Sequence, residues 1–496
     1  MEFQQHQSQS QTLTISERVK VNRNLTTTTT LTLTSEGQLR WTNGGKERCL
    51  TVEKEVLGFG SQGLLVTIRA LIDKETGFCI RASKGTRIRQ DFLFEFLSQE
   101  SKLLWCQKLQ EYIDYLDRPK RLFIIVNPYG GNKSASKIFN DQVKPLMDAA
   151  DIQYTVQETQ YQLHAKEIAH SLDLSRYDGV VCISGDGILV EVVNGLLLRK
   201  DWDLAIKVPL GIVLAGTGNG MVKSLLDSVG DCCSVSNAVL AIIRGHKCAL
   251  DVATVLQGET RFFSVLMLAW GLIADIDIES EKYRWMGSSR LDFYGLVRVL
   301  HLRKYNGRIF FVPAPGYEEY GNPCDQEIEC SGFETQVEDQ EDTVKVKEHC
   351  YQGPKFFKEE LEWRTIGGPF VSVWLHNVPW GSEDTMAAPN AKFSDGYLDL
   401  IIMKDCPKSS LLALISKLND GSHVKSPYVL YLKVKAFILE PGHRVEDPSK
   451  GGIIDSDGEV LARGEGTYKC ELRDPMAYGP MQITVDQGLA TLFCPR

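Results

Sequence analysis

Three glycine-rich turns contain the residues whose types and spacing could do chemistry on a phosphate. They are NPYGGNKS (127–134), SGDG (184–187) and GTGNG (216–220), and each follows an apolar segment typical of a buried strand. Glycine lets the backbone approach a phosphate closely, and a helix that begins after such a turn points its amide groups at the anion. Parallel strands ending at one crevice would bring the turns together, so the pattern predicts a polyphosphate cradle.

The spacing of these turns excludes two common phosphate loops. A Walker loop requires GxxxxGK[ST], and the stretch GGNKS contains those residue types at the wrong spacing. A dinucleotide-binding fingerprint requires GxGxxG, whereas Gly216 and Gly218 are followed by Met221. One such turn would be weak evidence, but three at successive strand ends favour a phosphate site.

Asp186, between two glycines, is the candidate catalytic group. Phosphoryl transfer needs a pocket for phosphates and a group that orients or deprotonates the acceptor hydroxyl. The alternative is a helix N-cap, a position that favours aspartate. Taken alone, the residue fits the cap better, and the neighbouring glycine turns shift the balance toward a catalytic carboxylate.

An acidic segment follows the long apolar run 262–274. Asp275, Asp277, Glu279 and Glu281 are spaced by two, so an extended strand would project all four from one face. We expect Asp275, Glu279 and Glu281 to be solvated. A carboxylate at the end of an apolar run also suits a lipid with a cationic head group.

Two further features could serve the phosphates. Arg284 and Arg290 could bind phosphate oxygens with their planar donors, or could be surface arginines. The DGE stretch, Asp457 to Glu459, is either a hairpin turn or an acidic turn that returns to the cradle and serves Mg²⁺.

The elements that must position these residues fall into an α/β part and a β-rich part. Between about 118 and 250, apolar strands alternate with amphipathic helices, which predicts a parallel sheet covered on both faces, a three-layer α/β nucleotide-binding domain. From 251 to 496 the segments are strand-like and predict a β-sandwich-like lipid-binding domain. Residues 316–355 are acidic and poor in large apolar residues, so we expect a disordered insertion there.

The amino-terminal part has a different pattern. Residues 1–30 are rich in Gln, Ser and Thr and predict a disordered tail. From 31 to 117, short alternating segments are followed by a helical stripe that contains Trp105. Strands closed by one such helix resemble a pleckstrin-homology-like module, which would bind membrane phosphoinositides or proteins, or serve only for packing.

Composition limits the partners. The 55 Lys and Arg against 64 Asp and Glu give a formal charge of −9 and no general reason to expect nucleic acid. The 13 cysteines form no Cys-x-x-Cys pair, which indicates reduced thiols in a cytosolic protein. Without a signal peptide or a span of ~20 apolar residues, we expect a cytoplasmic, peripherally membrane-associated protein, with the vacuolar or another endomembrane left open.

These motifs together resemble a known family. SGDGILVEVVNGLL resembles the signature of the diacylglycerol kinase catalytic domain, in the form carried by sphingosine kinases. NPYGGNKSASKIF, ETQYQLHAKEIA, AGTGNGM, LAWGLIADIDIESEKYRWMG and the late DGE follow in the same order. ADIDIESEKYR separates sphingosine kinases from diacylglycerol kinases and NAD kinases, and the whole chain looks most like a plant-type member.

The resemblance implies transfer of the ATP γ-phosphate to the primary hydroxyl of a sphingoid long-chain base, with Mg²⁺. Asp186 would be the base, and Asp277 would bind the amino or hydroxyl head of the lipid. The lipid substrate would contact Ser184, Gly185, Asp186, Gly187 and Asp277. The nucleotide would contact Asn127, Pro128, Tyr129, Thr159, Gln160, Tyr161, Gln162, Leu163, Glu191, Gly216, Thr217, Gly218, Arg284, Arg290, Asp457, Gly458 and Glu459, with Asp457 a candidate for the metal.

Two alternatives stay open at this point. One is a ceramide or diacylglycerol kinase of the same fold, whose substrates carry no cationic amine. The other is a non-catalytic lipid-binding scaffold. The preferred long-chain base, the oligomeric state, the membrane visited, and whether Asp186 accepts the proton or mainly orients the hydroxyl are not determined by the sequence.

Overall fold

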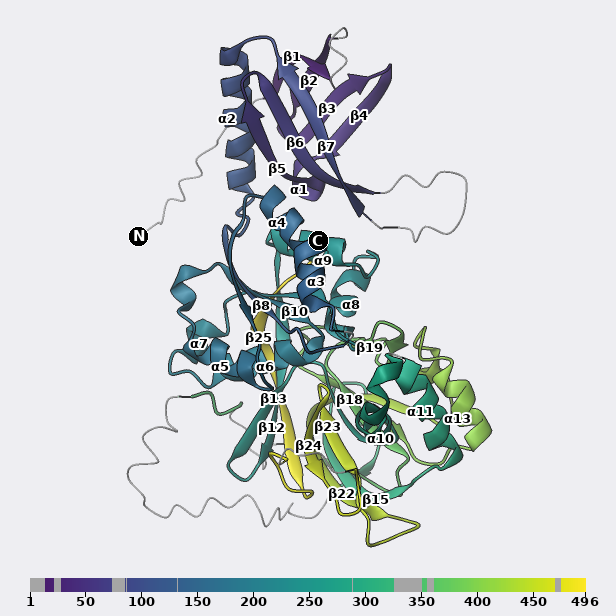
Figure 1. Ribbon diagram of the computed structural model, residues 1–496. Coiled ribbons are helices and arrows are strands. Elements are labelled where there is room, and N and C mark those ends of the chain that lie inside the picture. Colours follow the sequence, from purple (N-terminus) through teal and green to yellow (C-terminus); the bar gives the residue numbers. More distant parts are fainter. Residues whose placement is uncertain are drawn as a thin grey trace, which may run out of the picture.

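A computed structural model arranges the chain as three regions stacked along one axis (Figure 1). It describes residues 14–21, 28–73, 85, 87–131, 133–287, 289–324, 350–354, 361–468 and 474–496. The amino-terminal module lies at one end, a β-rich region lies at the other, and an α/β region lies between them.

The α/β region is built on parallel strands, as the sequence predicts. Its elements are β8 (Arg121–Val126), α3 (Ala135–Ile138), α4 (Lys144–Ala149), β9 (Gln153–Glu158), α5 (His164–Ser171), β10 (Gly179–Ser184), α6 (Asp186–Leu197), α7 (Trp202–Ala205), β11 (Leu210–Leu214), α8 (Gly220–Asp227) and α9 (Val235–Arg244). The parallel order is β11-β10-β8-β9. Neighbouring residues of one strand fill opposite faces of the sheet, Ile124 on one side and Ile125 on the other.

The β-rich region continues the same sheet. Its elements are β12 (Lys247–Gln257), β13 (Thr260–Ser264), β14 (Met267–Gly271), α10 (Leu272–Glu279), α11 (Ser289–Leu300), β15 (Tyr305–Pro313), β16 (Asn322–Pro323), β17 (Arg364–Gly367), β18 (Ser372–His376), β19 (Trp380–Ser382), β20 (Thr385–Met386), β21 (Leu398–Met403), α13 (Lys408–Ile415), β22 (Leu430–Arg444), β23 (Ile453–Ser456), β24 (Glu459–Arg463) and β25 (Met481–Phe493). The order β24-β23-β14-β18-β21-β22-β25 leads directly into β11 of the α/β region.

Strand β25 connects the two regions and changes the expected domain boundary. It pairs antiparallel with β12 and β22, and its end pairs in parallel with β11 through Leu492 and Leu210. The last strand of the chain therefore belongs partly to the α/β sheet, so a division at residue 250 is only approximate. The sequence of β25 predicts a strand, but it does not predict which distant strands pair with it.

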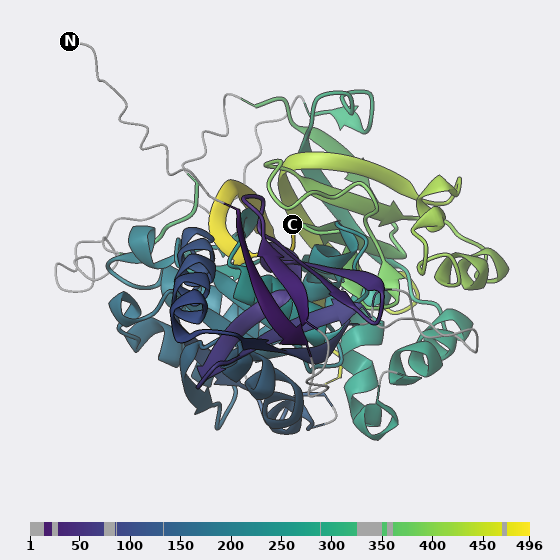
Figure 2. The ribbon, with the colours of Figure 1, turned by 90° about the horizontal axis from the view of Figure 1, so that it is seen from above.

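The amino-terminal module is an antiparallel sheet with a helix against it (Figures 1 and 2). Its elements are β1 (Ile15–Val21), β2 (Thr28–Leu33), β3 (Gln38–Asn43), β4 (Lys46–Thr51), α1 (Val52–Glu55), β5 (Val56–Gln62), β6 (Leu65–Asp73), β7 (Arg87–Phe96) and α2 (Gln99–Tyr115). The strand order is β4-β3-β2-β1-β7-β6-β5. Ser98 caps α2 by accepting from the Ser101 amide, and α2 buries Trp105 and Leu109 in the module core.

The predicted tail at 1–30 is wrong where β1 begins. Residues 15–21 form a strand that pairs with both β2 and β7, and Val19 and Val21 fill the core. The polar composition hides this strand because its other side chains face outward. Residues 1–13 of the expected tail lie outside the described residues.

The module packs tightly on the α/β region. Leu57 and Leu71 share one apolar core with Leu122 and Ile124 of β8. The guanidinium of Arg118 donates to the carbonyls of four residues around α1, namely Val52, Glu53, Val56 and Leu57. These contacts make the module a fixed part of the molecule rather than a tethered one.

The expected acidic insertion at 316–355 is described only at its two ends. On one side, Asn322 and Pro323 form β16 and pair with β17. On the other, Tyr351 is buried against Trp202 and Phe263, with ring centroids 4.6 and 5.4 Å away. The prediction of disorder is therefore wrong at 316–324 and 350–354, and residues 325–349 and 355 lie outside the described residues. Every helix in the described ranges is too short or too polar to cross a bilayer.

Candidate active site

A single cavity of about 710 Å³ joins the glycine turns to an apolar chamber of the β-rich region. The polar end is lined by Asn127, Gly130, Gly131, Ser184, Gly185, Asp186, Gly187, Glu191, Gly216, Thr217, Gly218, Asp457, Gly458 and Glu459. The apolar end is lined by Leu272, Ile273, Ile276, Leu291, Leu296, Trp374, Ile401, Met403, Leu411, Leu414 and Leu418, with Asp277 and Arg290 on its wall. The cavity can therefore hold a phosphate-bearing group and a long apolar chain together.

The three glycine turns touch one another backbone to backbone, as the sequence predicts. A Cβ added at Gly185 would lie 2.5 Å from the Gly218 carbonyl oxygen, and one at Gly216 would lie 2.3 Å from the Gly185 Cα. At Gly131, whose φ is +53°, an added Cβ would lie 3.0 Å from the carbonyl carbon of Gly216. Side chains at these positions would separate the turns, which is why the cradle needs glycine.

Asp186 is buried at the first position of α6, and Gly185 rather than Asp186 is the N-cap. Its carboxylate instead accepts from the amides of Gly220 and Met221 at 2.7 and 3.0 Å, at the start of α8. Asp186 therefore does cap a helix, as the alternative predicts. The capped helix is α8, and not α6, to which Asp186 itself belongs. Burial raises the pKa of Asp186 to about 6, with Asp457 and Glu383 adding to the rise and the two amides opposing it.

The DGE turn is anchored to the turn between β13 and β14. The Asp457 carboxylate accepts from the amides of Val265, Leu266 and Met267 at 3.0, 2.8 and 2.7 Å, and the residue has a φ of +56°. Burial raises the pKa of Asp457 to about 6. The amides hold the Asp457 carboxylate in place at the polar end of the cavity, and its role as a metal ligand stays a prediction.

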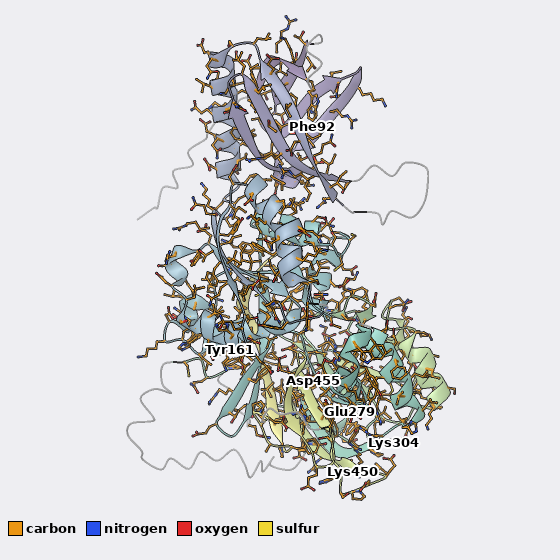
Figure 3. The ribbon with its side chains drawn as sticks, in the orientation of Figure 1. Phe92, Tyr161, Glu279, Lys304, Lys450 and Asp455 are labelled. Atoms are coloured by element: carbon orange, nitrogen blue, oxygen red, sulfur yellow. The ribbon has the colours of Figure 1, made fainter. Side chains whose placement is uncertain are left out.

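The predicted nucleotide loop at 159–163 stands beside the cavity, outside its lining. Thr159 is buried and donates to Asn127 Oδ1 at 3.4 Å, while Gln162 donates to Glu459 at 2.8 Å. Tyr161 is exposed and stacks on His164, with centroids 4.6 Å apart (Figure 3). These contacts connect the loop to both the first glycine turn and the DGE turn.

Five other residues that the sequence predicts at the nucleotide lie on this side of the molecule. Glu191 is buried and accepts from the Ala165 amide at 3.0 Å, so its carboxylate holds the start of α5. The backbone N–H of Gln160 donates to Nδ1 of the His164 ring. Leu163 is exposed and has a φ of +68°. Tyr129 is 60% exposed, and neither it nor Pro128 lines the cavity. The backbone of Tyr129 is fixed by Asn127 Oδ1 at 3.0 Å.

The acidic segment forms a helix, α10, and the prediction of a solvated strand face is wrong. Asp275 and Glu279 are one helical turn apart and share a buried side. Arg303 donates to them at 3.1 and 2.9 Å, and the Tyr305 hydroxyl donates to Asp275 at 2.6 Å. The charges that the alternation assigns to solvent are compensated by distant residues at the start of β15.

Asp277 lies on the other side of α10, where it lines the cavity. Burial raises its pKa, and Arg290 opposes the rise. Arg290 pairs with Glu281 at 2.6 Å and donates to Ser280 at 3.1 Å. An arginine expected at the nucleotide phosphates therefore lies beside the carboxylate expected at the lipid head. The Arg284 side chain lies outside the described residues.

Sequence reasoning missed several polar residues around the cavity. Asn219 donates to Gly216 at 3.1 Å and to Glu383 at 2.7 Å, so it supports the third glycine turn. Asp455, on β23, is fully buried and interacts with the carboxyl group of Asp277. Its only sequence signal is an acid within the apolar strand IIDS, two residues before the DGE turn.

Comparison with known proteins identifies the family. The diacylglycerol kinase catalytic domain family matches residues 121–255, and the YegS C-terminal NAD kinase beta sandwich-like domain matches residues 365–473. Sphingosine kinase 2 of Arabidopsis thaliana is 59% identical over 93% of this chain and 94% of its own. The chain belongs to the sphingosine kinase family. It is an ATP-dependent lipid kinase with a catalytic domain of the diacylglycerol kinase type and a carboxyl-terminal β-sandwich-like domain.

Two human proteins show how the similarity extends beyond plants. Human sphingosine kinase 1 is 32% identical to this sphingosine kinase family member, over 70% of this chain and 87% of its own. Human ceramide kinase is 30% identical, over 70% of this chain and 66% of its own. These similarities identify the reaction as phosphate transfer to a lipid, and they include both sphingosine kinases and a ceramide kinase. The identity of the lipid acceptor is therefore argued from the site.

Proposed function

We propose that the protein transfers the γ-phosphate of ATP to the primary hydroxyl of a sphingoid long-chain base and so produces the 1-phosphate. The observation that carries the proposal is the continuity of the cavity. Glycine turns at one end suit phosphates, an apolar chamber at the other end suits a hydrocarbon chain, and Asp277 stands on the chamber wall. A cationic amine is the group of a lipid head that a buried carboxylate selects.

Asp186 is proposed as the general base. Its carboxylate lines the cavity between the glycine turns, where the acceptor hydroxyl and the γ-phosphate would meet. A pKa raised by burial to about 6 leaves the group ionised at neutral pH yet basic enough to accept a proton. The amides of Gly220 and Met221 fix its orientation.

The nucleotide is proposed to occupy the polar end. The backbone of the three glycine turns would face its phosphates, with Asn127 and Thr217 beside them. The loop 159–163 and the DGE turn would flank it, held together by the contact of Gln162 with Glu459. Glu191 would act indirectly, because its carboxylate holds the start of α5, and Arg290 is better placed for the lipid head than for phosphates.

Mg²⁺ is proposed to arrive with the ATP phosphates rather than to occupy a protein cage. Among the described residues, no three His, Cys, Asp or Glu side chains gather in a way that could hold a metal ion. The Asp457 carboxylate is taken by three backbone amides. When bound, Mg²⁺ would neutralise phosphate charge during transfer.

A panel of lipid acceptors tests the proposed substrate class. Radiolabelled phosphate from ATP should transfer to sphingosine, dihydrosphingosine or phytosphingosine, and ceramide and diacylglycerol should accept far less. Asp277→Asn should raise the KM for the base much more than the KM for ATP. Preferred transfer to ceramide or diacylglycerol would replace the proposal with the first alternative, and no transfer to any lipid would favour a binding scaffold.

The amino-terminal module is proposed to be pleckstrin-homology-like and to help the enzyme reach its membrane-borne substrate. Its antiparallel sheet with one closing helix and a buried Trp105 supports this. Because Leu57 and Leu71 pack into the α/β core, the test should use the full chain. The chain should sediment with vesicles that contain phosphoinositides and stay in the supernatant with phosphatidylcholine alone. Equal recovery with both vesicles would exclude phosphoinositide recognition.

A further inference from the structure

Asp455 is a fully buried carboxyl group that the proposed reaction leaves without a role. It follows Ile453 and Ile454 in β23, and all three are completely inaccessible to solvent. In the part of the chain that the structure describes, no amide, hydroxyl or cation donates a hydrogen bond to either oxygen of Asp455. Its polar contact is the carboxyl group of Asp277 on α10, the residue that lines the cavity.

The carboxyl groups of the fully buried Asp455 and the half-buried Asp277 are in hydrogen-bond contact and cannot both be ionised, so the pair holds one proton. The charges around the pair decide which residue carries it. Arg290 lies near Asp277 and favours its ionised form, opposed by Glu281. Burial, then the Asp277 carboxyl and the charges of Asp457 and Glu459, raise the pKa of Asp455 well above its usual range. Asp455 is wholly inaccessible to solvent, whereas Asp277 is half-buried and lines the cavity beside Arg290, so this geometry favours the proton on Asp455 and the charge on Asp277.

Helix α10 fixes the backbone of Asp277 and leaves its carboxylate to be oriented. On the far side of the helix, Asp275 and Glu279 accept from Arg303 at 3.1 and 2.9 Å. These ion pairs hold the helix, but they do not touch the Asp277 side chain. The neutral carboxyl of Asp455 is the group that does so from within the protein.

We propose that Asp455 is a positioning residue for the amine of the sphingoid base. Its protonated carboxyl donates a hydrogen bond to one oxygen of Asp277 and leaves the other oxygen to accept from the substrate ammonium group. A neutral donor suits this task because it holds the carboxylate without neutralising it, whereas a lysine or arginine would compete with the ammonium. The inference rests on the proposed function and names a residue that selects the amine.

Asp455→Leu and Asp455→Asn test the inference in the full-length enzyme. Leucine removes the donor, whereas asparagine keeps an N–H that can donate to Asp277. Loss of a hydrogen bond to a charged group predicts a rise of about tenfold in the KM for sphingosine with D455L. We expect kcat and the KM for ATP to stay within about twofold, and D455N to restore the KM for sphingosine to within about threefold of the wild type.

An acceptor without the amine separates positioning from general damage. An alkane-1,3-diol of the same chain length carries the hydroxyl and the chain, so D455L should leave its kcat/KM unchanged. An unchanged KM for sphingosine in D455L overturns the inference, as does an equal rise in D455N. Parallel losses for the diol and sphingosine also overturn it, because they indicate a packing defect.

Two further outcomes keep the test decisive. If D455L does not fold, Asp455→Ser replaces it in the test. The serine side chain is too short to donate to Asp277 as the carboxyl does, so this variant must also raise the KM for sphingosine. If the wild type phosphorylates no sphingoid base, the proposed function itself fails. If the wild type phosphorylates sphingosine and the KM for sphingosine is unchanged in D455L or Asp455→Ser, only the proposed role of Asp455 is excluded.

Discussion

The two ends of the cavity hold their carboxylates in different ways. At the end with the glycine turns, proposed for the nucleotide, Asp186, Glu191 and Asp457 accept from backbone amides of nearby turns and helix starts. At the apolar end, proposed for the lipid, Asp277 on the cavity wall contacts another acid, and Asp275 and Glu279 on the far side of the same helix are held by the side chains of Arg303 and Tyr305. Backbone amides are supplied by any sequence that forms the turn, whereas side-chain partners must be specific residues at distant positions.

Substitutions should therefore have different effects on the two kinds of carboxylate. A carboxylate that accepts from backbone amides can be replaced by asparagine or glutamine, whose side-chain oxygen still accepts one hydrogen bond. The fold should then survive while the negative charge is lost. A side-chain-held carboxylate becomes an unpaired buried charge when its partner is removed. The nucleotide end should therefore lose activity before stability, and the lipid end should lose both.

Asp186→Asn should give the largest effect on catalysis. The asparagine side chain keeps an oxygen for the amide of Gly220 or Met221, but it cannot accept the acceptor proton. Removing a general base predicts a fall of about 10²–10⁴-fold in kcat. Phosphate transfer to sphingosine measures the loss, and calorimetric titration with ATP should show binding close to wild type. A kcat within tenfold of the wild type would contradict the assignment.

Arg303→Met should give the largest effect on stability. It removes the cation that donates to Asp275 and Glu279 and leaves only the longer 3.9 Å ion pair of Asp275 with Arg298, which predicts destabilisation by up to about 3–5 kcal/mol. The neighbouring Lys304 supplies a matched control, because it pairs at 2.7 Å with Asp405, whose side chain is 78% exposed. Lys304→Met should cost about 0–1 kcal/mol. Urea unfolding of both variants measures the contrast, and equal costs would remove the distinction between the two ends.

The pH dependence of kcat/KM should report the nucleotide end. Burial raises the pKa of Asp186 to about 6, so the base is protonated and inactive below that pH and ionised above it. The rate should rise about tenfold per pH unit below about 6 and then level off. Thermal unfolding at pH 5 and pH 7 checks that the loss at low pH is not unfolding. A limb centred near pH 4 would contradict a raised pKa for Asp186.

Glu191→Gln should give the smallest effect. Glutamine keeps one acceptor oxygen for the Ala165 amide but loses the negative charge and the second oxygen at the start of α5, where the amides of Leu163 and Lys166 also interact with Glu191, a cost of about 1 kcal/mol. We expect the KM for ATP to rise about fivefold, because the loop 159–163 is less well held, with kcat nearly unchanged. Steady-state kinetics with varied ATP measure this, and a loss in kcat rather than KM would show that Glu191 acts on the reaction itself.

The accuracy of the sequence predictions follows the same division. The glycine turns at 127–134, 184–187 and 216–220 were predicted to converge, and they do, because each lies at the end of a strand in one parallel sheet. The acidic segment was assigned to a strand because its acids alternate. The alternation is equally compatible with a helix that buries acids on both sides, once partners such as Arg303 and Asp455 are present.

By itself, the sequence determined the alternating strands and helices, the glycine turns and the acid among them, because these depend on neighbouring residues. Only the tertiary structure decided that Asp186 caps α8, that β25 joins the two regions, and that Asp277 has Asp455 beside it. The physical reason is distance along the chain. Helix periodicity and turn chemistry act within a few residues, whereas a buried charge is stabilised by whichever groups the completed fold brings to it.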